Sequence, residues 1–263
     1  NSIIMVRLNL FMVIFIFALA SIFTQCSEEK KQLHHYQLSL ASYNIRNAKG
    51  LDEKISYERI AEVIKKLDTD AIAIQEIDSC TNRSEGLFVL EELAKRTGMY
   101  PIYAPAIEFD GGKYGIGILC KQKPLSIKHY PLPGEEEKRT LIVAEFDHYI
   151  FSCTHLSLTE KDRLSSAKII YDILKSYKKP VFIGGDWNDT PDSKFIAEMN
   201  QNFYLLTDTA SHTFPASLPE TTIDYIAALK QDKTRINVSK AEVYDAEIES
   251  DHRPVKVIID YDY

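Results

Sequence analysis

Residues 181–192 read VFIGGDWNDTPD, and the interpretation of the whole chain starts from this stretch. A short apolar run that ends in two glycines is typical of a buried strand that stops abruptly. Asp186 and Asn188 follow at the end of that strand, where α/β folds place their ligands. An Asx-rich turn that caps the next helix would use the same residues, because Asp and Asn favour turns for local reasons. The stretch therefore predicts either a turn or a functional site.

The composition is that of a globular protein with an acidic surface. The chain has 263 residues, 45% of them hydrophobic and 26% charged, and a formal net charge of -7. This length suits one large α/β domain. Affinity for phosphate backbones comes largely from Lys and Arg, so nucleic acid is a possible partner but not a favoured one.

The first 26 residues predict export rather than a part of the fold. Arg7 is the only charged side chain among them, an apolar run covers residues 8–23, and the segment ends in Phe-Thr-Gln-Cys at Cys26. This pattern is typical of a secretory signal and resembles the lipobox of bacterial lipoproteins. We therefore expect a signal peptide at 1–26, lipidation of Cys26, a polar tether at 27–37 and a catalytic domain at 38–263. An uncleaved membrane anchor is the alternative.

This interpretation predicts a secreted lipoprotein, held by its lipid in the periplasm or at the outer surface of a Gram-negative bacterium. The remaining cysteines, Cys80, Cys120 and Cys153, have no metal-like spacing and imply no disulfide framework, although a pairing between two of them stays open. Cys120 and Cys153 lie in apolar runs and are expected in the core.

Strand patterns outnumber helix patterns by nearly three to one. Apolar periodicity predicts helices at 56–67, 87–96, 159–177 and 192–199. It predicts strands at 38–43, 70–75, 102–107, 114–120, 125–130, 141–146, 149–154, 181–183, 222–226, 241–248 and 255–259. These helices are too few to connect an all-parallel sheet, so we expect one domain of mixed sheets covered by helices.

Polar or titratable residues stand at the ends of six separate strand-like runs. They are Asn44, Glu76, His155, Asp186 with Asn188, Asp224, and Asp251 with His252. Each alone has an ordinary explanation, such as a helix cap or a His that bonds the backbone. Six such ends in one domain favour a shared site.

The motifs around these residues occur in a recognisable order. They are YNIR at 43–46, IQE at 74–76, THL at 154–156, GDWN at 185–188, IDY at 223–225 and SDHRP at 250–254. The ordered set resembles the endonuclease/exonuclease/phosphatase superfamily. The resemblance implies an α/β (α+β) fold, a four-layer sandwich of two mixed β-sheets flanked by helices, and an enzyme that hydrolyses phosphate esters.

The resemblance also implies roles for the residues. Glu76 is the first choice as a ligand of Mg²⁺, or Mn²⁺, helped by Asn44 and Asp251, because hard divalent ions prefer oxygen ligands. Asp224 would orient His252, and Asp186 would contact the attacking water. Asn188 and His155 would donate hydrogen bonds to the phosphate. Whether His252 or Asp186 is the general base stays open.

Three further residues bear on the substrate. Arg46 and Arg83 could bind a second anionic group, with a surface salt bridge as the alternative, especially for Arg83. Trp187 is expected to pack beneath the site rather than to stack on substrate. No Lys- or Arg-rich arm that could grip DNA is visible between residues 84 and 112.

We therefore expect a monomeric, metal-dependent phosphoesterase that cleaves a small, lipid-linked or nucleotide phosphodiester outside the cytoplasm. The alternatives are a phosphomonoesterase or sphingomyelinase-like hydrolase, an endo- or exonuclease, and a non-catalytic binding lipoprotein.

Overall fold

The computed structural model describes residues 33–232 and 234–263. Residues His35–Tyr263 form one compact unit. The predicted signal peptide, Cys26 and most of the predicted tether lie outside the described residues. Residues 35–37 are not part of a tether, because β1 begins at His35 and these residues pair with the end of β12. Their polar sequence reflects a strand end that extends beyond the β2 pairing, which starts at Leu40.

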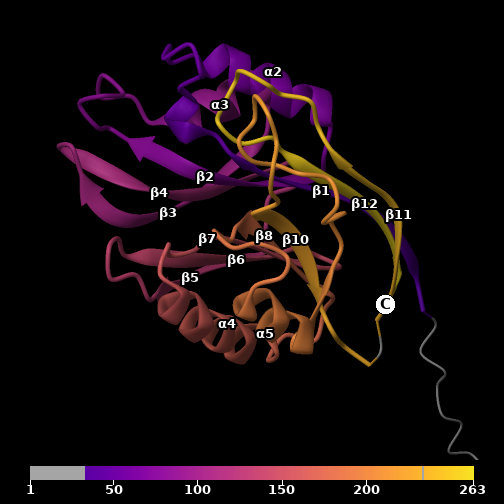
Figure 1. Cartoon of the computed structure of the whole chain (residues 1–263). Helices are drawn as coiled ribbons and strands as arrows, with labels where there is room; N and C mark the ends of the chain where they lie inside the picture. The colour runs from indigo at the N-terminus through magenta and orange to yellow at the C-terminus, as the bar shows by residue number, and fades with distance from the viewer. Residues whose placement is uncertain (1–32, 233) are drawn as a thin grey trace, which may run out of the picture. The chain divides into compact units, whose positions relative to one another are not determined.

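Twelve strands of the described part of the chain form two six-stranded sheets, which lie face to face in Figure 1. The first sheet has the order β11-β12-β1-β2-β4-β3. Its strands are β1 (His35–Asn44), β2 (Ala71–Ser79), β3 (Tyr100–Phe109), β4 (Gly112–Cys120), β11 (Arg235–Val243) and β12 (Val255–Asp262). The second sheet has the order β5-β6-β7-β8-β10-β9. Its strands are β5 (Ser126–Leu132), β6 (Arg139–Glu145), β7 (Ile150–His155), β8 (Val181–Asp186), β9 (Phe203–Leu205) and β10 (Asp224–Leu229).

Helices cover the outer face of each sheet, which completes four layers. Helices α2 (Tyr57–Leu67) and α3 (Val89–Thr97) cover the first sheet, and α4 (Glu160–Leu174) and α5 (Lys194–Asn202) cover the second (Figure 1). A short 3₁₀ segment, η1 (Arg46–Ala48), follows β1. The predicted sandwich of two mixed sheets flanked by helices is confirmed. Among the described residues, no helix has both the length and the apolar character needed to span a membrane.

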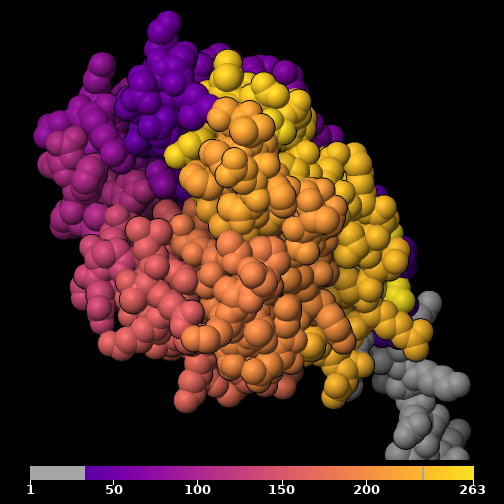
Figure 2. Space-filling view, viewed as in Figure 1, coloured from indigo at the N-terminus to yellow at the C-terminus, as the bar shows by residue number. Residues whose placement is uncertain are grey.

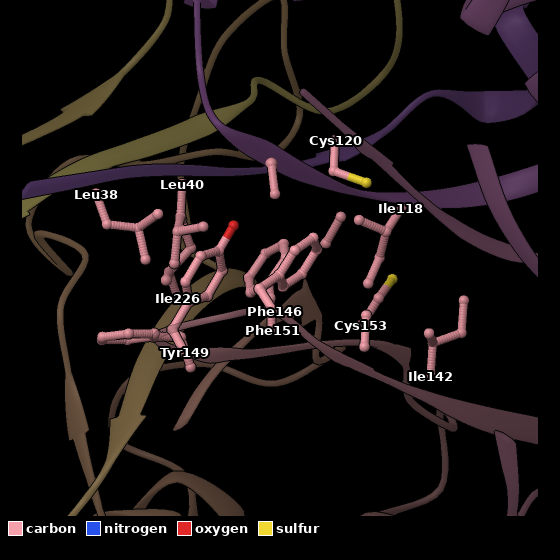
Figure 3. Close-up of a cluster of buried hydrophobic side chains, with 14 of the residues drawn as sticks. Leu38, Leu40, Ile118, Cys120, Ile142, Phe146, Tyr149, Phe151, Cys153 and Ile226 are labelled. Atoms are coloured by element: carbon pink, nitrogen blue, oxygen red, sulfur yellow. The ribbon is translucent and has the colours of Figure 1, made fainter. Parts of the chain in front are cut away.

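The largest apolar core lies between the two sheets. Figure 3 shows Leu38 and Leu40 of the first sheet facing Phe151 and Ile226 of the second. Two further clusters fill the space between each sheet and its helices. Cys120 and Cys153 are buried in the core as predicted, and Cys80, Cys120 and Cys153 are all free thiols. Figure 2 shows the late part of the chain, in yellow, lying against the early part, in indigo.

Each sheet contains one parallel pair of strands, and these pairs position the site. β1 is parallel to β2, with α2 as the connection, and β7 is parallel to β8, with α4 as the connection. The carboxyl ends of parallel strands meet at one edge of a sheet. Accordingly, Asn44 pairs in register with Gln75, the neighbour of Glu76, and His155 pairs with Asp186.

The predicted strands differ from the structure in three places. The predicted strand at 241–248 is wrong beyond residue 243, because β11 covers Arg235–Val243; it is an edge strand with mostly exposed residues and lacks a clear apolar alternation. The short edge strand β9 was not predicted. The predicted strand at 181–183 is too short, since β8 continues through both glycines to Asp186.

Candidate active site

Asn44 joins the two sheets at the site. It is fully buried at the end of β1, and its amide nitrogen donates hydrogen bonds of 3.0 Å to Glu76 Oε1 and 3.0 Å to Asp186 Oδ2. Its Oδ1 accepts a bond of 3.0 Å from the backbone nitrogen of Arg46, which fixes the orientation of the amide. A donor between two carboxylates offsets their mutual repulsion.

Glu76 reaches the site because β2 is irregular. A β-bulge interrupts the pairing with β4 between Ile74 and Ile77, and Glu76 has a left-handed φ of 61°. A bulge re-aims the side chain that it carries. Burial raises the pKa of Glu76, the hydrogen bond from Asn44 opposes this, and the negative charge of Asp251 raises the pKa further. The site therefore holds carboxylates whose repulsion is only partly offset.

Asp186 is buried at the end of β8 and lies at the centre of the polar contacts. Its Oδ1 accepts a bond of 2.9 Å from the backbone nitrogen of Asn188. Asn188 has a left-handed φ of 52°, which Asn tolerates better than most residues, and its amide donates to the carbonyl of Leu156 at 2.9 Å. The opening stretch is therefore both a turn and part of the polar cluster.

His252 and Asp224 form a buried pair. Nδ1 of His252 lies 2.9 Å from Asp224 Oδ2, and Nε2 lies 3.7 Å from Asp186 Oδ2. Burial alone would lower the pKa of His252, but the carboxylates of Asp224 and Asp186 raise it to about 10. The imidazole is therefore positively charged at neutral pH. The Phe214 ring packs on it with centroids 4.9 Å apart.

His155 approaches the same carboxylate from β7. Its Nε2 lies 3.5 Å from Asp186 Oδ2. Burial lowers the pKa of His155 to about 4, against the opposing effect of Asp186, so this imidazole is neutral. Two histidines of different charge thus face one carboxylate, a difference that suits different roles toward a phosphate group.

A cavity of about 410 Å³ opens onto this cluster. Glu76, Asp186, Asn188, His155, Asp251 and His252 line it, together with Tyr114, Glu137, Arg139, Leu158, Phe214 and Ile223. Asn44 and Asp224 stand behind the lining residues and act through the hydrogen bonds described above. The structure thus brings the eight residues predicted for catalysis and metal binding into one site.

Sequence reasoning missed several lining residues, of which Glu137 and Arg139 are charged. They lie in the run EEEKR at residues 135–139, which looks like a solvated turn. Arg139 is nevertheless buried at the start of β6, and its Nη1 lies 2.9 Å from Glu137 Oε1. Only its position directly before the apolar residues 141–144 could have suggested that it points inward.

Arg46 and Arg83 are not among the cavity-lining residues, and both form ion pairs within the protein. Arg46 contacts Glu53 at 3.2 Å and lies 3.8 Å from Asp251. Arg83 contacts the buried Asp78 through bonds of 2.6 Å and 2.8 Å, and its guanidinium lies 4.5 Å from the centroid of the Phe109 ring. Their predicted contacts with substrate stay predictions.

The donor atoms of the site fit a divalent cation. A carboxylate oxygen of Asp186, one of Asp224 and a nitrogen of His252 all lie within 4.8 Å of one another, a buried grouping that suggests a divalent metal site; both nitrogens of the charged His252 carry protons, so the carboxylate oxygens are the atoms that could hold the ion. The second carboxylate oxygen of Asp224 is buried and has no hydrogen-bond partner among the described residues. The carboxylates of Asp251 and Asp186 also repel that of Glu76. A bound divalent cation, which prefers oxygen ligands, would offset this repulsion.

The fold and the site define a class of protein, the α/β sandwiches whose facing sheets build one phosphoester-cleaving site. A sequence comparison identifies the particular family. The profile described as the Endonuclease/Exonuclease/phosphatase family matches residues 41–252, and the chain belongs to this family. It is accordingly a hydrolase that acts on phosphate esters. No curated protein is similar enough in sequence to count as a relative.

Solved structures share the fold. An endonuclease/exonuclease/phosphatase from Bacteroides vulgatus has a TM-score of 0.71 at 20% identity, over 85% of this chain and 98% of that one. A mannosyl-6-phosphatase from Bacteroides thetaiotaomicron has a TM-score of 0.66 at 20% identity, over 84% of this chain and 99% of that one. The catalytic domain of human Nocturnin, with a bound sulfate, has a TM-score of 0.64 at 19% identity, over 87% and 97%.

Proposed function

We propose that the protein is a Mg²⁺-dependent phosphodiesterase that cleaves a small, lipid-linked or nucleotide substrate outside the cytoplasm. The observation that carries this proposal is the bridge from Asn44 to Glu76 and Asp186, in the same cavity as the His252–Asp224 pair. This arrangement supports the proposal, because two carboxylates and an imidazolium surround one space large enough for a phosphate group.

Glu76, Asn44 and Asp251 would hold the cation. When bound, Mg²⁺ would supply positive charge that stabilises the phosphate oxygens during ester cleavage. Mn²⁺ would serve the same purpose. Ser250 supports this arrangement, because its hydroxyl donates to the carbonyl of Asn44 at 2.8 Å and lies 3.3 Å from Asp251 Oδ1.

The remaining residues have distinct roles toward water and phosphate. Asp186 Oδ2 orients the attacking water and takes its proton, and Asp224 fixes the His252 ring through Nδ1. His252 then presents the N–H of Nε2 to the phosphate and stabilises its negative charge. Neutral His155 can donate one further hydrogen bond. Asn188 donates to the phosphate after its amide leaves the Leu156 carbonyl.

Phosphomonoester hydrolysis is the second candidate. The likeness to a mannosyl-6-phosphatase favours it, as does a cavity of about 410 Å³, which matches a small molecule. A broad groove would suit duplex nucleic acid better, so a nuclease activity is the less favoured alternative.

A direct assay separates these functions. Bis(p-nitrophenyl) phosphate and p-nitrophenyl phosphate are compared with Mg²⁺, with Mn²⁺ and with EDTA. We expect metal-dependent release of p-nitrophenol, faster from the diester. Faster turnover of the monoester would favour the second candidate. Lack of metal-dependent turnover of both esters and of plasmid DNA would favour a binding lipoprotein instead.

We also propose that Cys26 is lipidated and anchors the protein to a membrane, on the strength of the lipobox-like sequence. Membrane and soluble fractions of cells that make the wild type or Cys26→Ala test this. Release of the variant into the soluble fraction is expected. A variant that stays in the membrane pellet would indicate an uncleaved anchor.

A further inference from the structure

Glu137 belongs to a loop that is fixed against the second sheet. Residues 133–138 connect β5 to β6, and the backbone nitrogen of Glu135 donates to the buried Asp162 at 2.7 Å. Glu136 accepts from the backbone nitrogen of Leu158 at 2.7 Å. A Cβ at Gly134 would lie 1.8 Å from the carbonyl oxygen of Glu137, so the tight path of this loop requires glycine. The loop therefore holds Glu137 in place.

The side chain of Glu137 forms part of the cavity wall. It is 27% exposed, and its Oε1 pairs with Arg139 Nη1 at 2.9 Å. Exposed Leu158 lies on the wall as well. A carboxylate has about four acceptor positions, and the pairing with Arg139 uses one oxygen. The carboxylate of Glu137 therefore keeps acceptor positions beyond the one that Arg139 uses.

The charges on the wall disfavour a second anion. Four carboxylates and two cationic groups line the cavity among the described residues; the carboxylates are Glu76, Glu137, Asp186 and Asp251, and the cations are the guanidinium of Arg139 and the imidazolium of His252. Glu137 pairs with the guanidinium of Arg139, which is therefore not free to bind a second anion, and the carboxylates of the wall outnumber its cations. A substrate part beside it gains most from hydroxyl groups, which donate to a carboxylate without adding charge.

We propose that Glu137 determines specificity for the alcohol that leaves from the phosphate, and that this alcohol is an uncharged polyol or sugar. The proposal rests on the phosphoesterase function proposed above and specifies its substrate class. Esters of anionic alcohols, including oligonucleotides, are rejected because they would bring a negative charge to Glu137.

Two matched probes test this proposal. Sorbitol 6-phosphate and 6-phosphogluconate differ only in a hydroxymethyl or carboxylate group at one end. Each is tested as a competitive inhibitor of the chromogenic ester that the enzyme turns over, and by the shift in Tm that it causes. We expect the wild type to prefer the sorbitol ester by about ten-fold or more. Glu137→Gln keeps the shape of the side chain and should bring this ratio close to one.

Glu135→Gln is the control. It removes one negative charge from the same loop, but Glu135 is 65% exposed, pairs with Lys161 and does not line the cavity. It should keep the wild-type ratio. A wild-type ratio near one, or the same ratio in Glu137→Gln, would overturn the proposal. So would a selective loss of p-nitrophenyl phosphorylcholine hydrolysis in Glu137→Gln, since that would indicate that residue 137 binds a cationic group of the substrate.

The two proposals can fail separately. If the chromogenic esters show no metal-dependent turnover, the proposed function is wrong, while the Tm shifts with the two probes still measure the preference. If turnover is present but the preference does not depend on Glu137, only the specificity proposal is wrong.

Discussion

Asn44→Asp tests whether one amide separates two carboxylates at a cation site. The substitution is nearly isosteric, but it replaces a donor with an anion 3.0 Å from Glu76 and 3.0 Å from Asp186. At an effective dielectric constant of about 20, each new contact costs about 5 kcal/mol before relaxation. That is comparable with the whole stability of many domains, about 5–15 kcal/mol. We expect uptake of a proton or a cation to relieve most of it.

The assay is thermal unfolding at pH 8 and pH 5, in EDTA and in Mg²⁺. Asn44→Asp should have a much lower Tm than the wild type in EDTA at pH 8. Mg²⁺ should recover more of the Tm in this variant than it adds to the wild type, because binding to the folded state alone stabilises it. Acidification should also reduce the difference, since protonation of one carboxyl removes the repulsion.

Asn44→Ala is the matched control, because it removes both hydrogen bonds and adds no charge. It should be destabilised, with no extra response to Mg²⁺. If Asn44→Asp in EDTA at pH 8 is as stable as the wild type, the two carboxylates are not both ionised beside residue 44. A Mg²⁺ response no larger than that of Asn44→Ala would refute the cation site at this position.

Three further predictions concern other parts of the molecule. Asp224→Asn should lower kcat by a factor of about 10² or more, with a smaller effect on KM, because His252 loses the partner that fixes its ring. Steady-state kinetics measures this, and a kcat equal to that of the wild type would show that Asp224 has no role in the mechanism. Trp187→Ala should lower the free energy of unfolding, measured in urea, by about 3–5 kcal/mol, because the ring is fully buried and stacks on the Tyr225 ring with centroids 4.9 Å apart. A loss below about 1 kcal/mol would contradict its packing role. Glu136→Gln should lower the Tm at pH 7. Burial alone would raise the pKa of Glu136, but hydrogen bonds from Ser157 and its neighbours lower it to about 2, so this stabilisation is present above about pH 4.5 and is lost as the pH falls toward 2. The difference from wild type should therefore narrow at pH 3, and a constant difference would contradict the role of the charge.

The apolar patterns predicted mixed sheets covered by helices, because these patterns are strong where both sides of a strand are covered; the four-layer arrangement was predicted from the family resemblance. β7 and β8 are buried along their whole length, and each was recognised as a short apolar run. β11 was misplaced because an edge strand buries little and carries no such pattern. Propensity and periodicity report burial, so they fail where a strand is held mainly by backbone hydrogen bonds.

The site was predictable where polar residues interrupt apolar strand ends, as at Asn44 and His155. It was not predictable where a charged residue enters the cavity from a run of charges. Arg139 follows three glutamates and a lysine, and the local pattern does not indicate that the chain turns inward there. The bulge that aims Glu76 also has no simple signature, because it depends on pairing with β4, which is distant in sequence.

The two glycines of the opening stretch have a different role from the one that the sequence suggested. They do not end the strand; they lie inside β8. A Cβ at Gly184 would lie 3.3 Å from Cβ of Ala73 and 3.5 Å from Cβ of Ser42, both on the facing sheet, so small residues let the sheets approach closely here. A Cβ at Gly185 would lie 2.2 Å from the carbonyl oxygen of Thr154. Asp186 follows Gly184 by two residues in β8, and the hydrogen bond from Asn44 to Asp186 crosses between the sheets there. The close approach of the sheets therefore allows one amide to reach a carboxylate of each sheet, Glu76 and Asp186.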